Sequence, residues 1–154
     1  MYMTNQRTKI KLLSALGCLL IGSSIYLFAR SRDHLGFALL DAVGLAHMTD
    51  MLRLPMRDIP IPYFVRFCLP DGLWVTSYIL FSDHINRHCM KMTRLAWASV
   101  VPILGIASEV LQLTQCIPGT FDILDLACYT IPLCLYIVLQ KQYRHRILYT
   151  TNNN

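Results

Sequence analysis

The feature that most constrains this chain is an uncharged apolar run from Leu12 to Ala29, flanked by Lys9, Lys11 and Arg30. A helix needs roughly 20 apolar residues to cross the hydrocarbon core of a bilayer, so this run is long enough to span one. A cleaved signal peptide is the competing interpretation. Residues 27–29 (Leu-Phe-Ala) lack the small residue expected two positions before a cleavage site, so we favour an uncleaved membrane anchor.

Three further apolar runs follow, at residues 69–85, 95–113 and 117–139. Pro70 suits the first turn of a helix. Residues 118–120 (Pro-Gly-Thr) form a turn signal, which makes the last two runs a helical hairpin. Hydrophobic residues make up 55% of the chain and charged residues 15%, whereas a soluble domain carries roughly 25% charged residues. The sequence therefore predicts an all-α polytopic membrane protein built as a four-helix transmembrane bundle.

The basic residues orient these four spans. They gather in three clusters, namely Arg7, Lys9 and Lys11, then Arg87, Lys91 and Arg94, then Lys141, Arg144 and Arg146. Residues 115–120 contain no Lys or Arg. If the N-terminus is cytoplasmic, all three clusters are cytoplasmic and the 115–120 turn is outside, as the positive-inside rule requires. We therefore expect a multi-pass protein of the inner (cytoplasmic) membrane with both termini in the cytoplasm.

The first outer loop, residues 30–68, contains a mostly apolar segment. Residues 35–52 are mostly apolar, with polar residues spaced along them. We predict an amphipathic helix at about residues 33–53 that lies in the interface or re-enters the membrane. A fifth span is the alternative, but it would bury Asp41 near mid-membrane, where a charge is costly. On this interpretation residues 1–154 form a single membrane domain.

Four carboxylates fall in the outer halves of the spans, where charged groups are rare and commonly functional. Glu109 and Gln112 are three residues apart, so they share a helix face, and Asp122 and Asp125 repeat that spacing. Helical rise places Glu109 and Asp125 at similar depth below the outer turn. Together with Asp71 at the start of the second span, these residues predict a polar pocket that opens to the outside.

Carboxylates this close together in a low dielectric cannot all be ionised. We expect at least one of Glu109, Asp122 and Asp125 to be protonated near neutral pH, or to pair with an arginine of the first outer loop. The nearest candidate charge partners in this topology are Arg30, Arg32 and Arg66. For Asp71 and Asp122 taken singly, helix capping is the competing interpretation.

The sequence gives no comparable signal at the cytoplasmic ends of the spans. His84 and His88 have a spacing that can hold a metal, but Arg87 and Lys91 would repel a cation, so we predict no metal there. Asp83 is then expected to lie at a solvated helix end and to tolerate replacement. The net charge of +5 resides in the topology clusters, which argues against nucleic-acid binding. We predict no catalytic residues and no cofactor.

Residues 108–112 (Ser-Glu-Val-Leu-Gln) and 118–125 (Pro-Gly-Thr-Phe-Asp-Ile-Leu-Asp) resemble the signature of the VanZ-like family. These small polytopic membrane proteins are named for an accessory protein of glycopeptide (teicoplanin) resistance. Residues 70–74 (Pro-Asp-Gly-Leu-Trp) are a looser match. The chain departs from the family pattern at Thr120, Tyr129 and Pro132, which replace an Arg, an Asn and a Gly. The resemblance implies a divergent member, located in the bacterial cell envelope and linked to glycopeptide resistance.

Three functions fit this pattern. The first is a non-enzymatic envelope protein whose outer pocket binds a membrane lipid or a lipid-linked envelope component. The second is a membrane enzyme that acts on a lipid-linked substrate at the outer face, although no nucleophile–base pair is visible. The third is a small transporter that uses Glu109 and Asp125 as a proton relay. The sequence lacks the internal repeat that is common in transporters, but assembly into a homo-oligomer could supply the missing helices. We favour the first.

Overall fold

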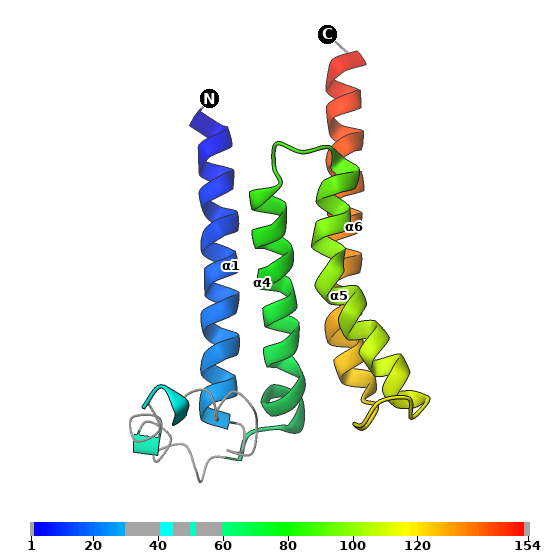
Figure 1. Cartoon of the computed structure of the whole chain (residues 1–154). Coiled ribbons are helices and arrows are strands. Elements are labelled where there is room, and N and C mark those ends of the chain that lie inside the picture. The colour runs from blue at the N-terminus through cyan, green and yellow to red at the C-terminus, as the bar shows by residue number, and fades with distance from the viewer. Residues whose placement is uncertain (1, 30–40, 45–49, 52–59, 153–154) are drawn as a thin grey trace.

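The computed structural model describes residues 2–29, 41–44, 50–51 and 60–152, and this part of the chain is helical without strands, as predicted. The elements are α1 (Tyr2–Ala29), the π-helix η2 (Phe64–Cys68), α4 (Leu69–Ile85), α5 (Lys91–Leu113) and α6 (Ile123–Asn152). Figure 1 shows α1, α4, α5 and α6 side by side, with alternating direction. Both termini lie at one end, here called the terminal end, and the α5–α6 turn lies at the opposite, hairpin end.

Three helices are long and apolar enough to cross a membrane, over Thr8–Ala29, Lys91–Leu113 and Ile123–Lys141. They overlap the first, third and fourth predicted spans. The second predicted span corresponds to α4, which has only 17 residues. The π-helix η2 leads directly into α4 and lengthens it at the hairpin end.

The central element of the bundle is α4, which contacts α1, α5 and α6. Its Val75 and Ile79 are 3% exposed and form the apolar core with Ala98 of α5 and Tyr136 of α6. The hydroxyl of Ser77 is also buried, and it donates to the backbone carbonyl of Ala15 in α1 at 2.8 Å.

The outward faces of the other helices carry large apolar side chains. Leu13 and Leu20 of α1, Leu104 of α5 and Leu139 of α6 are each more than 60% exposed. A water-soluble protein of this size rarely exposes so much contiguous apolar surface. Such a surface is consistent with helices that are long and apolar enough to cross a membrane.

The hairpin between α5 and α6 depends on two glycines. A Cβ atom at Gly105 would lie 2.8 Å from the ring of Tyr129, so only glycine lets α5 approach α6 this closely. Gly119 has φ +142°, which an L side chain rarely adopts, and it turns the chain. Because of this turn α6 begins at Ile123, and the prediction that the fourth span begins at Ile117 was wrong.

The first outer loop lies largely outside the described residues. Of the amphipathic helix predicted at about residues 33–53, the structure describes only residues 41–44 and 50–51. Whether this segment lies on the membrane or spans it therefore stays a prediction.

Candidate functional site

The hairpin end of the bundle holds the carboxylates that the sequence singled out. Glu109 is only 5% exposed. Its Oε2 accepts a hydrogen bond from the backbone N–H of Asp122 at 3.0 Å. This bond joins the last turns of α5 to the residue that precedes α6. Glu109 therefore fixes the geometry of the hairpin from inside the bundle.

Asp122 caps the start of α6. Its Oδ1 accepts from the backbone N–H of Leu124 at 2.8 Å, and its Oδ2 accepts from the hydroxyl of Tyr63 at 2.6 Å. Capping, the competing interpretation for Asp122, is therefore what the structure shows. The hydrogen bond from Tyr63, followed by that from Leu124, holds the pKa of Asp122 below its usual range. The same bond raises the pKa of Tyr63 to about 12. Sequence reasoning did not identify Tyr63 as a partner, because 59 residues separate the two.

Asp125 lies close to Asp122 and to the buried thiol of Cys68. One carboxylate oxygen of Asp122, one of Asp125 and the Sγ atom of Cys68 all lie within 4.8 Å of one another. Asp71, in the first turn of α4, and Glu109 also lie near enough to act electrostatically, with Asp125, on the hydroxyl of Tyr129. Asp71, Glu109 and Asp125 thus lie within electrostatic range of one hydroxyl, and Asp122 joins them through its contacts with Glu109 and Asp125. We call Asp71, Glu109, Asp122 and Asp125 the hairpin-end cluster.

The structure describes two of the remaining residues predicted for this site, Gln112 and Arg66. The side chain of Gln112 rests against Gly119, where a Cβ atom would come within 2.8 Å of its amide. Arg66 lies in η2, and its guanidinium carbon is 6.0 Å from the centre of the Phe67 ring. Arg30 and Arg32 are outside the described residues, so their role as charge partners stays a prediction.

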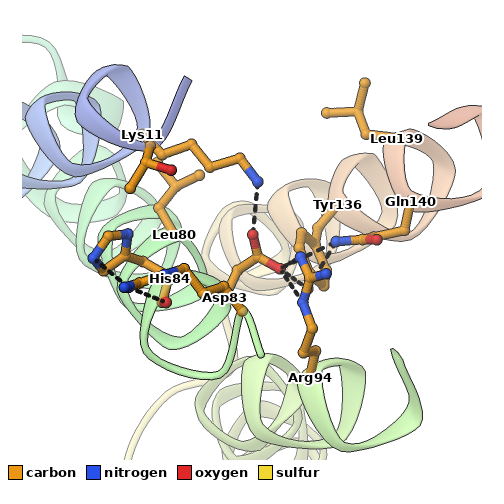
Figure 2. Close-up of a pocket in the computed structure, with 10 residues that line it drawn as sticks. Lys11, Leu80, Asp83, His84, Arg94, Tyr136, Leu139 and Gln140 are labelled. Atoms are coloured by element: carbon orange, nitrogen blue, oxygen red, sulfur yellow. Dashed lines mark hydrogen bonds and ion pairs between the residues drawn. The ribbon is translucent and has the colours of Figure 1, made fainter. Parts of the chain in front are cut away.

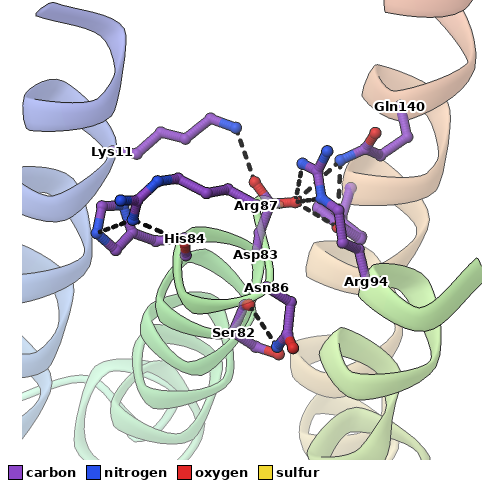
Figure 3. A network of polar contacts seen from close by, with 9 residues as sticks. Lys11, Ser82, Asp83, His84, Asn86, Arg87, Arg94 and Gln140 are labelled. Carbon is purple, nitrogen blue, oxygen red and sulfur yellow. Dashed lines mark hydrogen bonds and ion pairs between the residues drawn. The ribbon is translucent and has the colours of Figure 1, made fainter. Parts of the chain in front are cut away.

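The terminal end holds a second polar cluster, centred on Asp83. We expected Asp83 at a solvated helix end, and this was wrong: Asp83 is 2% exposed. Figures 2 and 3 show side chains from α1, α5 and α6 pointing toward its carboxylate. Near the end of α4 the residue faces the other helices, so neighbouring side chains rather than water surround it.

Each carboxylate oxygen of Asp83 has defined partners. Oδ2 accepts from Nζ of Lys11 at 2.7 Å. Oδ1 accepts from the Tyr136 hydroxyl at 2.7 Å and from Nε2 of Gln140 at 3.1 Å. The guanidinium of Arg94 also donates to Oδ1, through Nε at 3.1 Å and through Nη2. One carboxylate therefore links all four long helices. We call Lys11, Asp83, Arg94, Tyr136 and Gln140 the Asp83 cluster.

Local spacing in the sequence does not identify this cluster, but the predicted topology could have done so. Lys11 and Arg94 were interpreted only as topology markers, although the same topology brings them to the end of the bundle where Asp83 lies. A single carboxylate among converging basic residues is a candidate for burial, because pairing offsets its desolvation.

A cavity of about 560 Å³ adjoins the Asp83 cluster. Residues from α1, α4, α5, α6 and the loop after α4 line it (Figure 2). Leu80 and Leu139 give it apolar walls, while Lys11, Arg87 and Arg94 supply positive charge. Arg87, in the loop after α4, turns back onto the end of that helix, with Nη1 3.3 Å from Nε2 of His84 and 3.4 Å from the carbonyl oxygen of His84 (Figure 3). The volume falls within the usual range of small-ligand pockets, roughly 300–1,000 Å³.

Comparison of the chain with protein-family models, with curated proteins and with solved structures finds no match in any of the three.

Proposed function

We propose that this chain is a non-enzymatic, four-span membrane protein of the bacterial cell envelope. Its hairpin end faces outward and binds a cationic group of an envelope component, such as the ammonium of a lipid headgroup. The observation that carries this proposal is that Asp71, Glu109 and Asp125, from three separate helix ends, lie within electrostatic range of Tyr129. Asp122 lies beside Asp125, and its backbone N–H donates to Glu109.

The composition of the α5–α6 turn favours a cationic ligand, although Arg66 of η2 also lies at the hairpin end. The turn at residues 115–120 contains no Lys or Arg. Ammonium groups are recognised by carboxylates through charge-assisted hydrogen bonds, which are roughly twice as strong as neutral ones. A ligand with N–H donors would therefore bind better here than an equally charged ligand without them.

Four spans rather than three follow if η2 and α4 cross the membrane together. Their combined length is roughly 30 Å, which matches the hydrocarbon core. The termini would then lie on the same side, as the basic clusters require. Within this proposal, the resemblance to the VanZ-like family at residues 108–125 and its link to glycopeptide resistance remain expectations.

Lipid retention by the purified full-length protein tests the ligand class. Phosphatidylethanolamine and phosphatidylcholine carry the same net charge, but only the first has N–H donors. In native mass spectrometry from nanodiscs that contain both, we expect retention of phosphatidylethanolamine to exceed that of phosphatidylcholine about tenfold, as one charge-assisted bond allows.

Matched variants locate the effect. Asp125→Asn and Glu109→Gln remove charge from the hairpin-end cluster and should abolish the preference. Asp41→Asn removes an exposed carboxylate of the first outer loop and should leave it intact. Equal retention of the two lipids by the wild type, or equal effects of all three variants, would contradict the proposed ligand.

A further inference from the structure

The cavity at the terminal end has a charge opposite to that of the hairpin-end cluster. Its lining contains three cationic side chains, Lys11, Arg87 and Arg94, and one carboxylate, Asp83. Asp83 is already engaged by Lys11 and Arg94. Counting Lys, Arg and Asp alone, the lining keeps two positive charges that no lining carboxylate compensates.

The three cations differ in how strongly the fold holds them. Arg94 is 20% exposed and donates twice to Asp83, so its position is fixed. Lys11 is 48% exposed, and one N–H of its ammonium meets Asp83. Arg87 is exposed, and its guanidinium contacts the ring and the carbonyl oxygen of His84 in the preceding turn. Arg87 can therefore turn toward a ligand without breaking the Asp83 cluster.

The cavity combines these charges with an apolar surface. Leu80 and Leu139 line it beside the cations, and Leu139 is 62% exposed on the outer face of α6. The lining thus runs from the charged end of the bundle to a surface of the kind that contacts lipid. A molecule with a phosphate group and an acyl chain matches both parts of this lining.

We propose that this cavity binds an anionic phosphate group, carried by the headgroup of a membrane lipid such as phosphatidylglycerol. Arg87 and Lys11 contact the phosphate oxygens, and Asp83 holds Lys11 and Arg94 in place. Basic pockets between helices at a membrane surface are a recurrent form of anionic-lipid site. The site is separate from the hairpin-end cluster and does not depend on the ligand proposed there.

The experiment uses full-length protein in nanodiscs of phosphatidylcholine mixed with phosphatidylglycerol. Native mass spectrometry counts the lipids retained, and thermal unfolding in micelles measures stabilisation by added phosphatidylglycerol or by inorganic phosphate. We expect the wild type to retain phosphatidylglycerol over phosphatidylcholine and to be stabilised by it.

Two variants and one control assign this binding to the cavity. Arg87→Gln should lower retention of phosphatidylglycerol about fivefold, the contribution of one basic residue near a membrane surface. Leu139→Trp fills the cavity without changing charge and should also lower retention. Lys91→Gln removes an exposed cation from the start of α5, outside the cavity, and should leave retention unchanged.

The outcomes separate the site from general surface charge. Equal loss in Arg87→Gln and Lys91→Gln, with none in Leu139→Trp, would overturn the proposal. So would equal retention of the two lipids together with no stabilisation by phosphate. If inorganic phosphate stabilises the wild type and phosphatidylglycerol does not, the phosphate site stands and the lipid source is wrong. Should Arg87→Gln fail to fold, the wild-type measurements and Leu139→Trp still decide.

Discussion

The hydroxyl of Tyr136 donates a hydrogen bond to Oδ1 of Asp83 at 2.7 Å, across 53 residues of sequence and between two helices. Both side chains are buried, at 8% and 2% exposure. Because Lys11 and Arg94 reach the same carboxylate, this contact lies where the four long helices meet. The Asp83 cluster thus connects the four long helices at the terminal end and also forms one wall of the cavity.

Replacing Asp83 with Ala should destabilise the protein strongly. The change removes the shared acceptor of Tyr136, Gln140 and Arg94, and leaving a buried donor such as the Tyr136 hydroxyl unsatisfied costs about 1–3 kcal/mol. Equilibrium unfolding in mixed micelles measures the effect. Lys91→Ala, at an exposed position, is the control and should change the free energy of unfolding by less than about 0.5 kcal/mol. Similar values for the two variants would contradict a structural role for Asp83.

Glu109→Ala should also destabilise the hairpin, by about 1 kcal/mol, because the partly buried backbone N–H of Asp122 loses its acceptor. Glu109→Gln keeps an acceptor oxygen and should recover part of this loss. Val110→Ala, at the neighbouring and half-exposed position, is the control. If Glu109→Gln is as damaging as Glu109→Ala, the charge of Glu109 matters more than the hydrogen bond.

The hydrogen bond between Tyr63 and Asp122 predicts a pH dependence. Because the folded protein lowers the pKa of Asp122 below its ordinary value of 3.8, the bond stabilises fully above that value. The stabilisation is lost as the pH falls through the folded pKa. Tyr63→Phe should therefore lower the melting temperature at neutral pH, and this difference should shrink in acid. A difference that stays constant from about pH 7 to about pH 3 would contradict the bond.

Helix positions were largely predictable from this sequence, whereas contacts between helices were not. The prediction for residues 69–85 coincides with α4, because Pro70 marks its start and the apolar run its extent. The start of α6 was missed because residues 117–122 are apolar enough to continue a span, while Gly119 turns the chain there.

The two polar clusters also differ in how far the sequence could predict them. The helical spacing of Glu109, Gln112, Asp122 and Asp125 indicated the hairpin end, since the hairpin is local in sequence. The environment of Asp83 was not predictable in this way, because its partners Lys11 and Tyr136 lie 72 and 53 residues away. Only the packing of α1 and α6 against α4 brings them together.

The most direct test of the account is the sidedness of two cysteines that the chain already contains. Cys116 lies in the α5–α6 turn at the hairpin end, and Cys89 lies in the loop between α4 and α5; both are exposed. Single-cysteine variants that retain one or the other can be labelled in spheroplasts with a membrane-impermeant maleimide. We predict that Cys116 reacts in intact spheroplasts and that Cys89 reacts only after lysis. Labelling of Cys89 in intact spheroplasts, or of both residues from the same side, would contradict the four-span bundle with an outward hairpin end.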